Sequence, residues 1–335
     1  MSPRRRIIPI FVPHLGCPNQ CVFCDQKRIS GSLFPACGDT VREALDALTG
    51  EGYELAFYGG SFTAIEPERQ EELLAAVQPY RAAGLVTSIR VSTRPDAIDR
   101  ATLARLRRYG VEIIELGAQS MTEEVLRRSG RGHSAADTVC AATLIKEEGF
   151  QLILQLMTGL PGESRGSALT SAQRLAALGP DGVRIYPTVI LRGTALEELW
   201  KHGEYEEHTV EEAVDCCADI LPVFEAAGIP VIRLGLNPTE ELSGGAVAGG
   251  AYHPALGELV KSRIWLRRMR AALGSMEEKV DIILYVPPAA LSQAIGQKRG
   301  NIFALMEEYR LSSLKICPDA QISGENLRIS VAKRN

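Results

Sequence analysis

The distribution of apolar residues along the chain predicts an alternation of strands and helices. Short apolar runs are each followed by a stretch in which apolar residues recur at helical spacing. The runs predict buried strands, at Ile7–Val12, Glu54–Tyr58, Ser88–Val91, Glu112–Leu116, Leu152–Met157, Gly182–Ile185 and Pro230–Leu234. The stretches between them predict helices at Thr40–Leu48, Pro67–Ala83, Asp99–Tyr109, Thr122–Arg128, Ala135–Glu148, Arg165–Ala177 and Val210–Ala227.

This alternation indicates an α/β fold. Strands separated by helical crossovers form a parallel sheet, and the repetition favours a partial or complete (β/α) barrel. In such a barrel the chemistry takes place at the carboxyl ends of the strands. Functional residues are therefore expected in the segments that follow the predicted strands.

The pattern changes after Leu234. A glycine-rich segment over 242–254 predicts a loop, and a helix is expected over Leu256–Leu273. A small α+β unit follows, with two short helices between a first strand and two later ones, at Val280–Val286, Ser313–Ile316 and Asn326–Val331. The expected domains are a barrel over 1–241, a connecting loop and helix over 242–278, and a C-terminal domain over 279–335.

Composition limits the class of protein. The chain of 335 residues is 45% hydrophobic and 23% charged, as globular proteins are. No apolar run reaches the ~18 residues of a membrane span, so no membrane partner is expected. Eight cysteines without a signal-peptide pattern favour the reducing cytoplasm.

Charge is divided unevenly along the chain. From Tyr252 to the C-terminus there are 13 Lys and Arg against 8 Asp and Glu, a net charge of +5, whereas the whole chain carries −4. The remainder therefore carries −9. A basic tail on an acidic body favours a polyanionic partner, and a solvated helix face is the alternative.

Cys17, Cys21 and Cys24 form a C-x3-C-x2-C pattern. Three thiolates on one short segment can bind three irons of a [4Fe–4S] cluster and leave the fourth iron open, as a catalytic centre requires. An electron-transfer cluster or a structural zinc site needs four ligands. The alternative is three buried or zinc-binding cysteines.

This spacing resembles the signature of the radical S-adenosylmethionine (radical SAM) enzymes. The resemblance implies a [4Fe–4S] cluster and S-adenosylmethionine as cofactors. It also implies reductive cleavage of S-adenosylmethionine to a 5′-deoxyadenosyl radical, with the electron coming from an external flavodoxin- or ferredoxin-type reductant. Gly59, Gly60 and Ser61 resemble the element that holds the methionine amino group in that family. Met157 opens a segment similar to the one that supports adenine, and Val189 lies where apolar backbone packs on the adenine ring.

Polar residues follow the third and fourth predicted strands. Ser92, Thr93 and Arg94 carry hydroxyls and a guanidinium suited to the carboxylate or ribose of S-adenosylmethionine, and a helix cap is an equal alternative. Glu115 and Gln119 are candidates for ribose hydroxyls or substrate.

Four residues are candidates for catalytic roles on the substrate side: Glu115, His133, Tyr252 and His253. Each histidine is also compatible with an ordinary packed or turn position.

A narrower resemblance covers roughly the first two-thirds of the chain. The radical-SAM half of the Elongator catalytic subunit family is similar at Phe57–Thr63, Ser92–Asp96, Glu115–Ser120, Arg131-Gly132-His133, Ile185–Thr194 and Glu198-Leu199-Trp200. The Elongator subunit has a longer spacing before its last two cysteines. That family continues into an acetyltransferase domain, for which the roughly hundred residues after the barrel are expected to be too few. Its carboxymethylation of transfer-RNA uridine is therefore not carried over.

The C-terminal unit has a resemblance of its own. Residues 295–302, Ile-Gly-Gln-Lys-Arg-Gly-Asn-Ile, lie between the two predicted short helices and resemble the signature loop of the KH RNA-binding domain. In KH domains this loop clamps the nucleic-acid backbone, which implies RNA contacts by Lys298 and Arg299. Arg299 replaces the expected second glycine, and Gly300 stands one place later. A structural lid on the barrel is the alternative.

The chain is thus predicted to be a radical SAM enzyme with a small KH-like domain, acting on an RNA substrate, either a tRNA or an rRNA. Two alternatives stay open. One is a radical SAM oxidoreductase acting on a small molecule, similar to the coproporphyrinogen dehydrogenase group. The other is a non-catalytic iron–sulfur module that senses redox state or binds RNA.

Overall fold

The computed structural model describes residues 6–12, 17, 21–25, 36–236, 242–274 and 280–332. The chain divides into two compact units, Met1–Tyr252 and His253–Asn335. No helix among the described residues is long and apolar enough to cross a bilayer.

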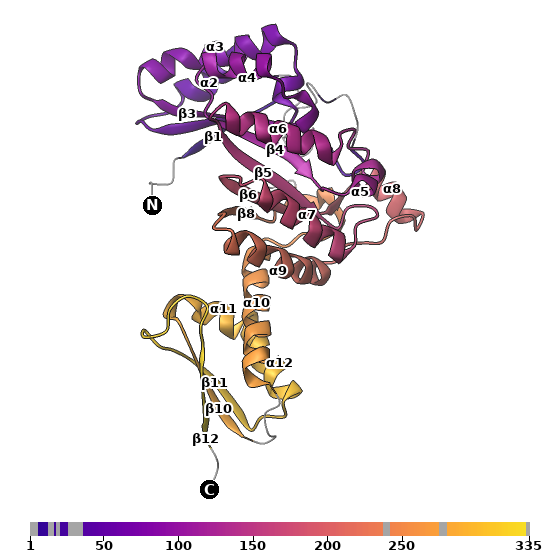
Figure 1. Cartoon of the computed structure of the whole chain (residues 1–335), viewed down its shortest axis with the longest axis vertical. Coiled ribbons are helices and arrows are strands. Elements are labelled where there is room, and N and C mark those ends of the chain that lie inside the picture. Colours follow the sequence, from indigo (N-terminus) through magenta and orange to yellow (C-terminus); the bar gives the residue numbers. More distant parts are fainter. Residues whose placement is uncertain are drawn as a thin grey trace. The chain divides into compact units, whose positions relative to one another are not determined.

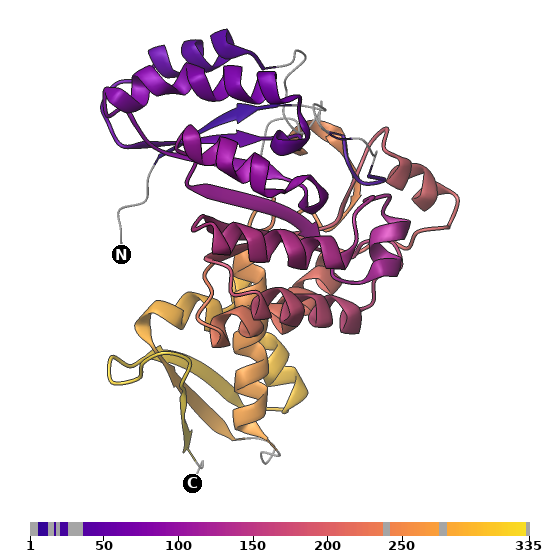
Figure 2. The ribbon, with the colours of Figure 1, turned by 45° about the horizontal axis from the view of Figure 1, so that its top comes forward.

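Seven parallel strands in the described part of the first unit form one sheet, whose spatial order follows the chain (Figure 1). The strands are β1 Ile7–Phe11, β2 Tyr53–Tyr58, β3 Val86–Thr93, β4 Ile113–Gln119, β5 Gln151–Thr158, β6 Gly182–Pro187 and β8 Val231–Leu234. The sheet curls into a partial barrel, as Figure 2 shows. The predicted α/β class and the partial-barrel architecture are confirmed.

Helices connect successive strands, and several begin where the sequence supplies a cap. They are α2 Gly38–Asp46, α3 Pro67–Ala82, α4 Arg100–Arg108, α5 Glu123–Arg128, α6 Ala135–Glu147, α7 Arg165–Ala177, α8 Ala195–Lys201 and α9 Val210–Ala226, with short 3₁₀ turns η1 Phe62–Ala64 and η2 Pro95–Ala97. The side chains of Asp99, Ser134, Ser164 and Thr209 each accept a hydrogen bond from the helix's first turn. All seven residues of β4 are buried, as expected of a strand covered on both faces.

The glycine-rich segment that the sequence predicted as a loop contains regular structure. Residues Leu242–Ala246 form a helical turn (η3), and β9 Val247–Gly250 pairs antiparallel with β7 Val189–Leu191. Gly250 has φ +88°, and a Cβ there would lie 2.9 Å from the carbonyl oxygen of Thr188. Glycine is needed because the two backbones approach too closely for a side chain.

The boundary between the units falls within the segment expected to connect two domains. Strand β9 belongs to the first unit, whereas α10 Leu256–Leu273 belongs to the second. The division at Tyr252 and His253 therefore lies eleven residues beyond the expected end of the barrel at 241.

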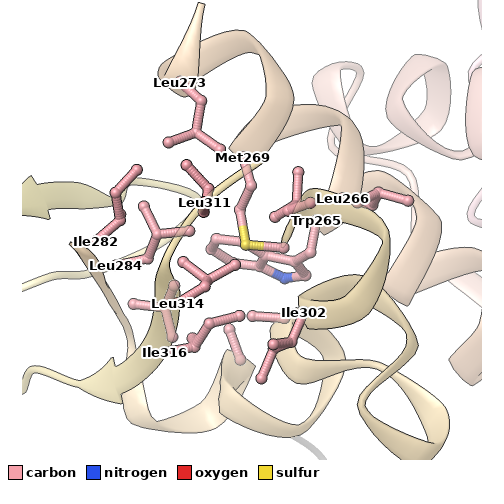
Figure 3. Close-up of a cluster of buried hydrophobic side chains, with 14 residues drawn as sticks. Trp265, Leu266, Met269, Leu273, Ile282, Leu284, Ile302, Leu311, Leu314 and Ile316 are labelled. Atoms are coloured by element: carbon pink, nitrogen blue, oxygen red, sulfur yellow. The ribbon is translucent and has the colours of Figure 1, made fainter. Parts of the chain in front are cut away.

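The second unit has its own sheet and core. Its remaining elements are β10 Asp281–Val286, η4 Pro288–Ala290, α11 Leu291–Ile295, η5 Gln297–Arg299, α12 Gly300–Glu308, β11 Ser313–Pro318 and β12 Arg328–Ala332. Strand β10 lies between β11, to which it is parallel, and β12, to which it is antiparallel. Trp265 and Met269 of α10 pack with Leu284 of β10, Leu314 of β11 and Ile302 of α12 (Figure 3). Apolar side chains from every layer of the unit thus meet in one core.

Candidate functional site

The three cysteines lie on a segment that is tied to two other parts of the first unit. Cys21 is buried, and Cys17 and Cys24 are half-buried. The amide of Val22 donates to the carbonyl of Ser129 over 3.0 Å, and the carbonyl of Val22 accepts from the amide of Leu196 over 2.8 Å. Cys21 and Cys24 are free thiols.

Arg131 supplies a cation to this segment. Its Nη1 donates to Sγ of Cys21 over 3.4 Å, and its Nη2 donates to the carbonyl of Gly117 over 2.6 Å. The pKa of the Cys24 thiol is raised to about 12, mainly by burial and then by the neighbouring thiols of Cys21 and Cys17, while Arg131 acts in the opposite direction. A metal centre bound there would displace the proton of Cys24, because the thiolate is the form that binds metal.

Cysteine thiolates are the ligands that proteins commonly use for iron–sulfur clusters. Among the described residues, no three His, Cys, Asp or Glu side chains gather around one point as ligands of one metal ion do. Cysteines that hold a [4Fe–4S] cluster each bind a separate iron, so their sulfurs need not share one coordination sphere. Cys17, Cys21 and Cys24 are therefore suited to hold such a cluster.

The predicted Gly-Gly element lies at the end of β2. Gly59 has φ +101°, a conformation that side-chain-bearing residues rarely adopt. The Ser61 hydroxyl is 2.9 Å from that of Thr93 at the end of β3, and it accepts from the amide of Arg94 over 3.2 Å. Buried hydroxyls thus join two strand ends that the sequence predicted separately as cofactor-binding.

Ser92 and Arg94 differ in their hydrogen-bond partners. The Ser92 hydroxyl is buried and has no hydrogen-bond partner among the described residues. The Arg94 guanidinium is buried and donates to Asp96 over 2.5 Å and to the carbonyl of Arg131 over 3.0 Å. Arg94 therefore holds the segment that carries Arg131, and Ser92 retains an unused polar group.

Glu115, predicted as a catalytic residue, lies in a buried ionic network. Its Oε2 is 3.3 Å from Nη1 of Arg90 on β3 and 3.0 Å from Nε of Arg184 on β6. The Arg184 contact is an ion pair, because Nε is not aligned for a hydrogen bond. Arg90 also donates to Glu54 on β2 over 2.7 Å. Two carboxylates and two guanidiniums from four strands thus balance each other's charge.

Two phenols complete this network. Arg184 donates to the hydroxyl of Tyr58 over 3.1 Å and to that of Tyr186 over 3.2 Å. Burial, followed by the nearby Glu115, raises the pKa of Tyr58 to about 12, so the phenol stays protonated at neutral pH. These partners were not predicted, because only their positions on separate strands bring the arginines and tyrosines together.

Gln119 ends β4 in a strained conformation. It has φ +64° and is buried, and its Oε1 accepts from Nε2 of Gln155 over 3.2 Å. Two residues earlier, a Cβ on Gly117 would lie 2.6 Å from Nη2 of Arg131. A left-handed non-glycine residue beside a glycine with no space for a side chain is typical of functional strand ends.

His133 is a neutral, buried histidine. Its Nε2 donates to the carbonyl of Ala118 over 3.2 Å, and its Nδ1 has no partner among the described residues. The pKa of His133 is lowered to about 4, mainly by burial and then by Arg131. The hydrogen bond assigns the proton to Nε2, which leaves Nδ1 as an acceptor.

Tyr252 and His253 lie on either side of the division between the two units. The amide of Tyr252 donates to the carbonyl of Gly250 in a tight turn directly after β9. The ring nitrogen Nδ1 of His253 accepts from the amide of Ala255 over 3.1 Å, and its carbonyl accepts from the amide of Leu256. His253 thus shapes the turn that begins α10.

The two residues expected near adenine are both buried. Met157, the residue before the last of β5, lies in a small apolar cluster with Val125 and Leu160, against which Phe23 of the cysteine segment packs. Val189 is the first residue of β7. Met157 therefore contributes to positioning the cysteine segment as well as to the strand end.

Glu163, which follows the end of β5, was not predicted as a functional residue. Oε2 of Glu163 accepts from the amide of Gly159 over 2.7 Å, while its Oε1 is shielded from solvent and has no partner among the described residues. Burial raises the pKa of Glu163 to about 8. A Glu in a Gly-Pro-rich turn looks from sequence like an ordinary surface residue, so nothing pointed to it.

Two family profiles match the chain. The profile described as the radical SAM superfamily matches residues 11–175, and the one described as the radical SAM C-terminal domain matches residues 180–266. Together they span about three quarters of the chain. The chain belongs to the radical SAM superfamily, whose enzymes bind a [4Fe–4S] cluster and S-adenosylmethionine. The predicted enzyme class and cofactors are confirmed.

More particular similarities point to one branch of that superfamily. The chain is 31% identical to tRNA uridine(34) acetyltransferase of Methanocaldococcus infernus, over 48% of this chain and 34% of that protein. It is 31% identical to Elongator complex protein 3 of Homo sapiens, over 52% of this chain and 32% of that protein. It therefore spans about a third of the length of these curated relatives.

A solved structure shares the fold. The archaeal Methanocaldococcus infernus Elp3 with an N-terminal deletion superimposes with a TM-score of 0.62 at 24% identity, covering 79% of this chain and 63% of that one. The predicted resemblance to the Elongator catalytic subunit family is confirmed at the level of sequence and fold.

Proposed function

We propose that this radical SAM enzyme acts on RNA, with the second unit as the part that binds it. The observation that carries the proposal is the junction between α11 and α12, where Lys298 and Arg299 are both exposed. The unit that presents them has a net charge of +5, whereas the rest of the chain carries −9. Phosphate neutralisation by Lys and Arg supplies much of the affinity of RNA-binding proteins.

The names of the relatives agree with this substrate class. One of them is named for its action on a tRNA uridine. Because the chain spans only about a third of that protein, we leave the base and the group transferred open. A tRNA is the first RNA to test.

In the first unit, Cys17, Cys21 and Cys24 would hold the cluster. Gly59, Gly60 and Ser61 would hold the methionine end of S-adenosylmethionine, with Ser92 and Thr93 at the next strand end. When bound, the cluster supplies the electron for reductive cleavage of S-adenosylmethionine. An external flavodoxin- or ferredoxin-type protein is the proposed electron source.

Further residues would surround the nucleoside and substrate. Gln119, Met157 and Val189 lie at or just beyond the ends of three neighbouring strands, and all are buried. The buried ionic network around Glu115 would organise the polar interior, and the Nδ1 lone pair of His133 is an acceptor for a donor on a ligand.

RNA binding by the anaerobically reconstituted full chain tests the proposal. We expect labelled tRNA to bind with an affinity that falls as salt is raised. The double variant K298A/R299A should bind several-fold more weakly. Lys315→Ala removes an exposed lysine of β11 in the same unit and should have a smaller effect. Wild-type protein that cleaves S-adenosylmethionine but binds no RNA would favour a small-molecule substrate instead.

A further inference from the structure

The loop that carries Lys298 and Arg299 is fixed from beneath by Asn301. The Nδ2 of this buried residue lies within hydrogen-bond distance of the carbonyl and hydroxyl of Ser262 on α10, both at 3.0 Å, and of the carbonyls of Gln293 and Ala294. Gly296 has φ +78°, and a Cβ there would lie 3.0 Å from Asn301. The loop is therefore bound to the body of its unit.

Both cationic residues of the loop have left-handed backbones. Lys298 has φ +50° and Arg299 has φ +62°. Side-chain-bearing residues disfavour this region, so two in succession require surrounding contacts that hold them there. The fixed loop presents its two cations in a defined place instead of on a free chain.

Phe303 lies one turn further along α12 and faces outward. It is 58% exposed, more than any other large apolar side chain among the described residues. The inward face of the helix is already filled by Ile302 and Leu305, and Ile302 points into the core in Figure 3. The fold does not need an aromatic ring at position 303.

The ring is adjacent to the loop cation. The guanidinium carbon of Arg299 lies 5.9 Å from the centroid of the Phe303 ring. An aromatic face beside a guanidinium plane can receive an unpaired base, since bases stack on either surface. In a duplex both faces of each base are already covered by stacking.

We propose that Phe303 and Arg299 form a stacking site for one unpaired base of a single-stranded RNA segment, whose adjoining phosphates contact Lys298. The inference rests on the proposed function and deepens it, because it specifies the form of RNA that the second unit recognises. The surface selects flexible loops or tails of an RNA over its helical stems. Charge decides between RNA and an apolar protein partner, since the exposed ring lies beside two cations on a basic unit.

The test compares three ligands on the full-length protein. They are a short fluorescent oligoadenylate, the same chain with abasic riboses, and the oligoadenylate annealed to its complement. We expect wild type to prefer the oligoadenylate. Phe303→Ala should weaken oligoadenylate binding roughly 5- to 150-fold, the range for loss of one stacked base, and leave the abasic chain unchanged. Phe303→Trp should retain binding.

The salt dependence of binding distinguishes the phosphate contact of Lys298 from base stacking on Phe303. Lys298→Ala should reduce the slope of log affinity against log salt by about 0.7, the value for one phosphate on a single strand, whereas Phe303→Ala should leave the slope unchanged. Val331→Ala removes another exposed apolar side chain of the same unit and serves as the control. Unchanged thermal melting of Phe303→Ala verifies the fold.

The outcomes distinguish the two levels of the proposal. If Phe303→Ala binds oligoadenylate as tightly as wild type, or weakens oligoadenylate and abasic chains equally, the stacking site is wrong. Weakened tRNA binding by K298A/R299A would leave the RNA function standing in that case. If wild type binds none of these RNAs or tRNA, the proposed function itself is wrong, and the stacking site with it.

Discussion

Arg131 holds the buried thiol of Cys21: its Nη1 donates to Sγ over 3.4 Å, while its Nη2 is anchored on the carbonyl of Gly117 over 2.6 Å. The contact joins the segment before α6 to the cysteine segment. A cation that donates a hydrogen bond to a thiolate stabilises negative charge there. Reduction of a cluster adds negative charge, so Arg131 should favour the reduced form.

Replacing Arg131 should therefore make the cluster harder to reduce. We expect Arg131→Met to shift the midpoint potential by on the order of 50 mV to more negative values. A charge-assisted hydrogen bond contributes roughly 1.5–3 kcal/mol at most, and for one electron 59 mV is about 1.4 kcal/mol. An anaerobic redox titration followed by electron paramagnetic resonance, without S-adenosylmethionine, measures the shift. Arg128→Met removes a nearby exposed arginine, and an equal shift in that variant would contradict a specific contact.

Replacing a cysteine of the cysteine segment should affect cluster binding, whereas replacing a cysteine elsewhere in the chain should not. Cys21→Ala should reduce iron bound after reconstitution severely and abolish 5′-deoxyadenosine production, because two thiolates hold a cluster poorly. Cys140→Ala removes an exposed cysteine of α6 and should retain wild-type iron content. Iron and sulfide assays measure the cluster, and chromatography measures 5′-deoxyadenosine. A Cys21→Ala protein that still forms 5′-deoxyadenosine would contradict the assignment of Cys21 as a cluster ligand.

Removing Glu115 should destabilise the first unit. Glu115→Ala leaves the guanidiniums of Arg90 and Arg184 buried with less counter-charge, and breaking a buried ion pair costs roughly 3–5 kcal/mol. Glu115→Gln should cost less because it preserves shape. Urea unfolding measures the difference, with the more exposed Glu112→Gln as a control. Near-wild-type stability of Glu115→Ala would instead favour a direct role on substrate.

Glu163 should make stability fall as pH rises. Its folded pKa is about 8 against an ordinary value of 4.5, so between these values the folded state holds a proton that the unfolded state has lost. The free energy of unfolding should therefore decrease as pH rises from 4.5 to 8, by at most about 1.4 kcal/mol per pH unit. Above pH 8 it should become constant. Below pH 4.5 both states are protonated and the effect vanishes.

Glu163→Gln should remove this dependence. Its gain in melting temperature over wild type should grow from pH 5 to pH 8.5, while Glu206→Gln, at an exposed position, should track wild type throughout. If the melting temperatures of wild type and Glu163→Gln changed with pH in parallel, the carboxyl group of Glu163 would ionise in the folded protein as it does in the unfolded one.

Much of the fold was predictable because it depends on local patterns. Apolar runs such as Leu152–Met157 lie inside strand β5, and Ser92 and Thr93 extend β3 beyond its predicted end. The strand β9 was missed because glycine disfavours strands in isolation, and only the close approach to β7 explains Gly250.

The candidate site could be proposed from sequence where spacing along the chain carries the chemistry, as in Cys17, Cys21 and Cys24. It was not predictable where residues meet through the fold. The partners of Glu115 come from two other strands, and the roles of Arg94 and Arg131 depend on contacts between loops. No local pattern encodes such pairs.

The contacts of Arg94 connect the two halves of the site. Its amide donates to the Ser61 hydroxyl at the Gly-Gly element, and its guanidinium donates to the carbonyl of Arg131, whose own guanidinium reaches Cys21. The segment proposed to hold the methionine end of S-adenosylmethionine is therefore joined to the cysteine segment through two successive arginine side chains. Thermodynamic reciprocity then gives the consequence: a ligand that raises the electron affinity of the iron must itself bind more tightly once the electron has arrived.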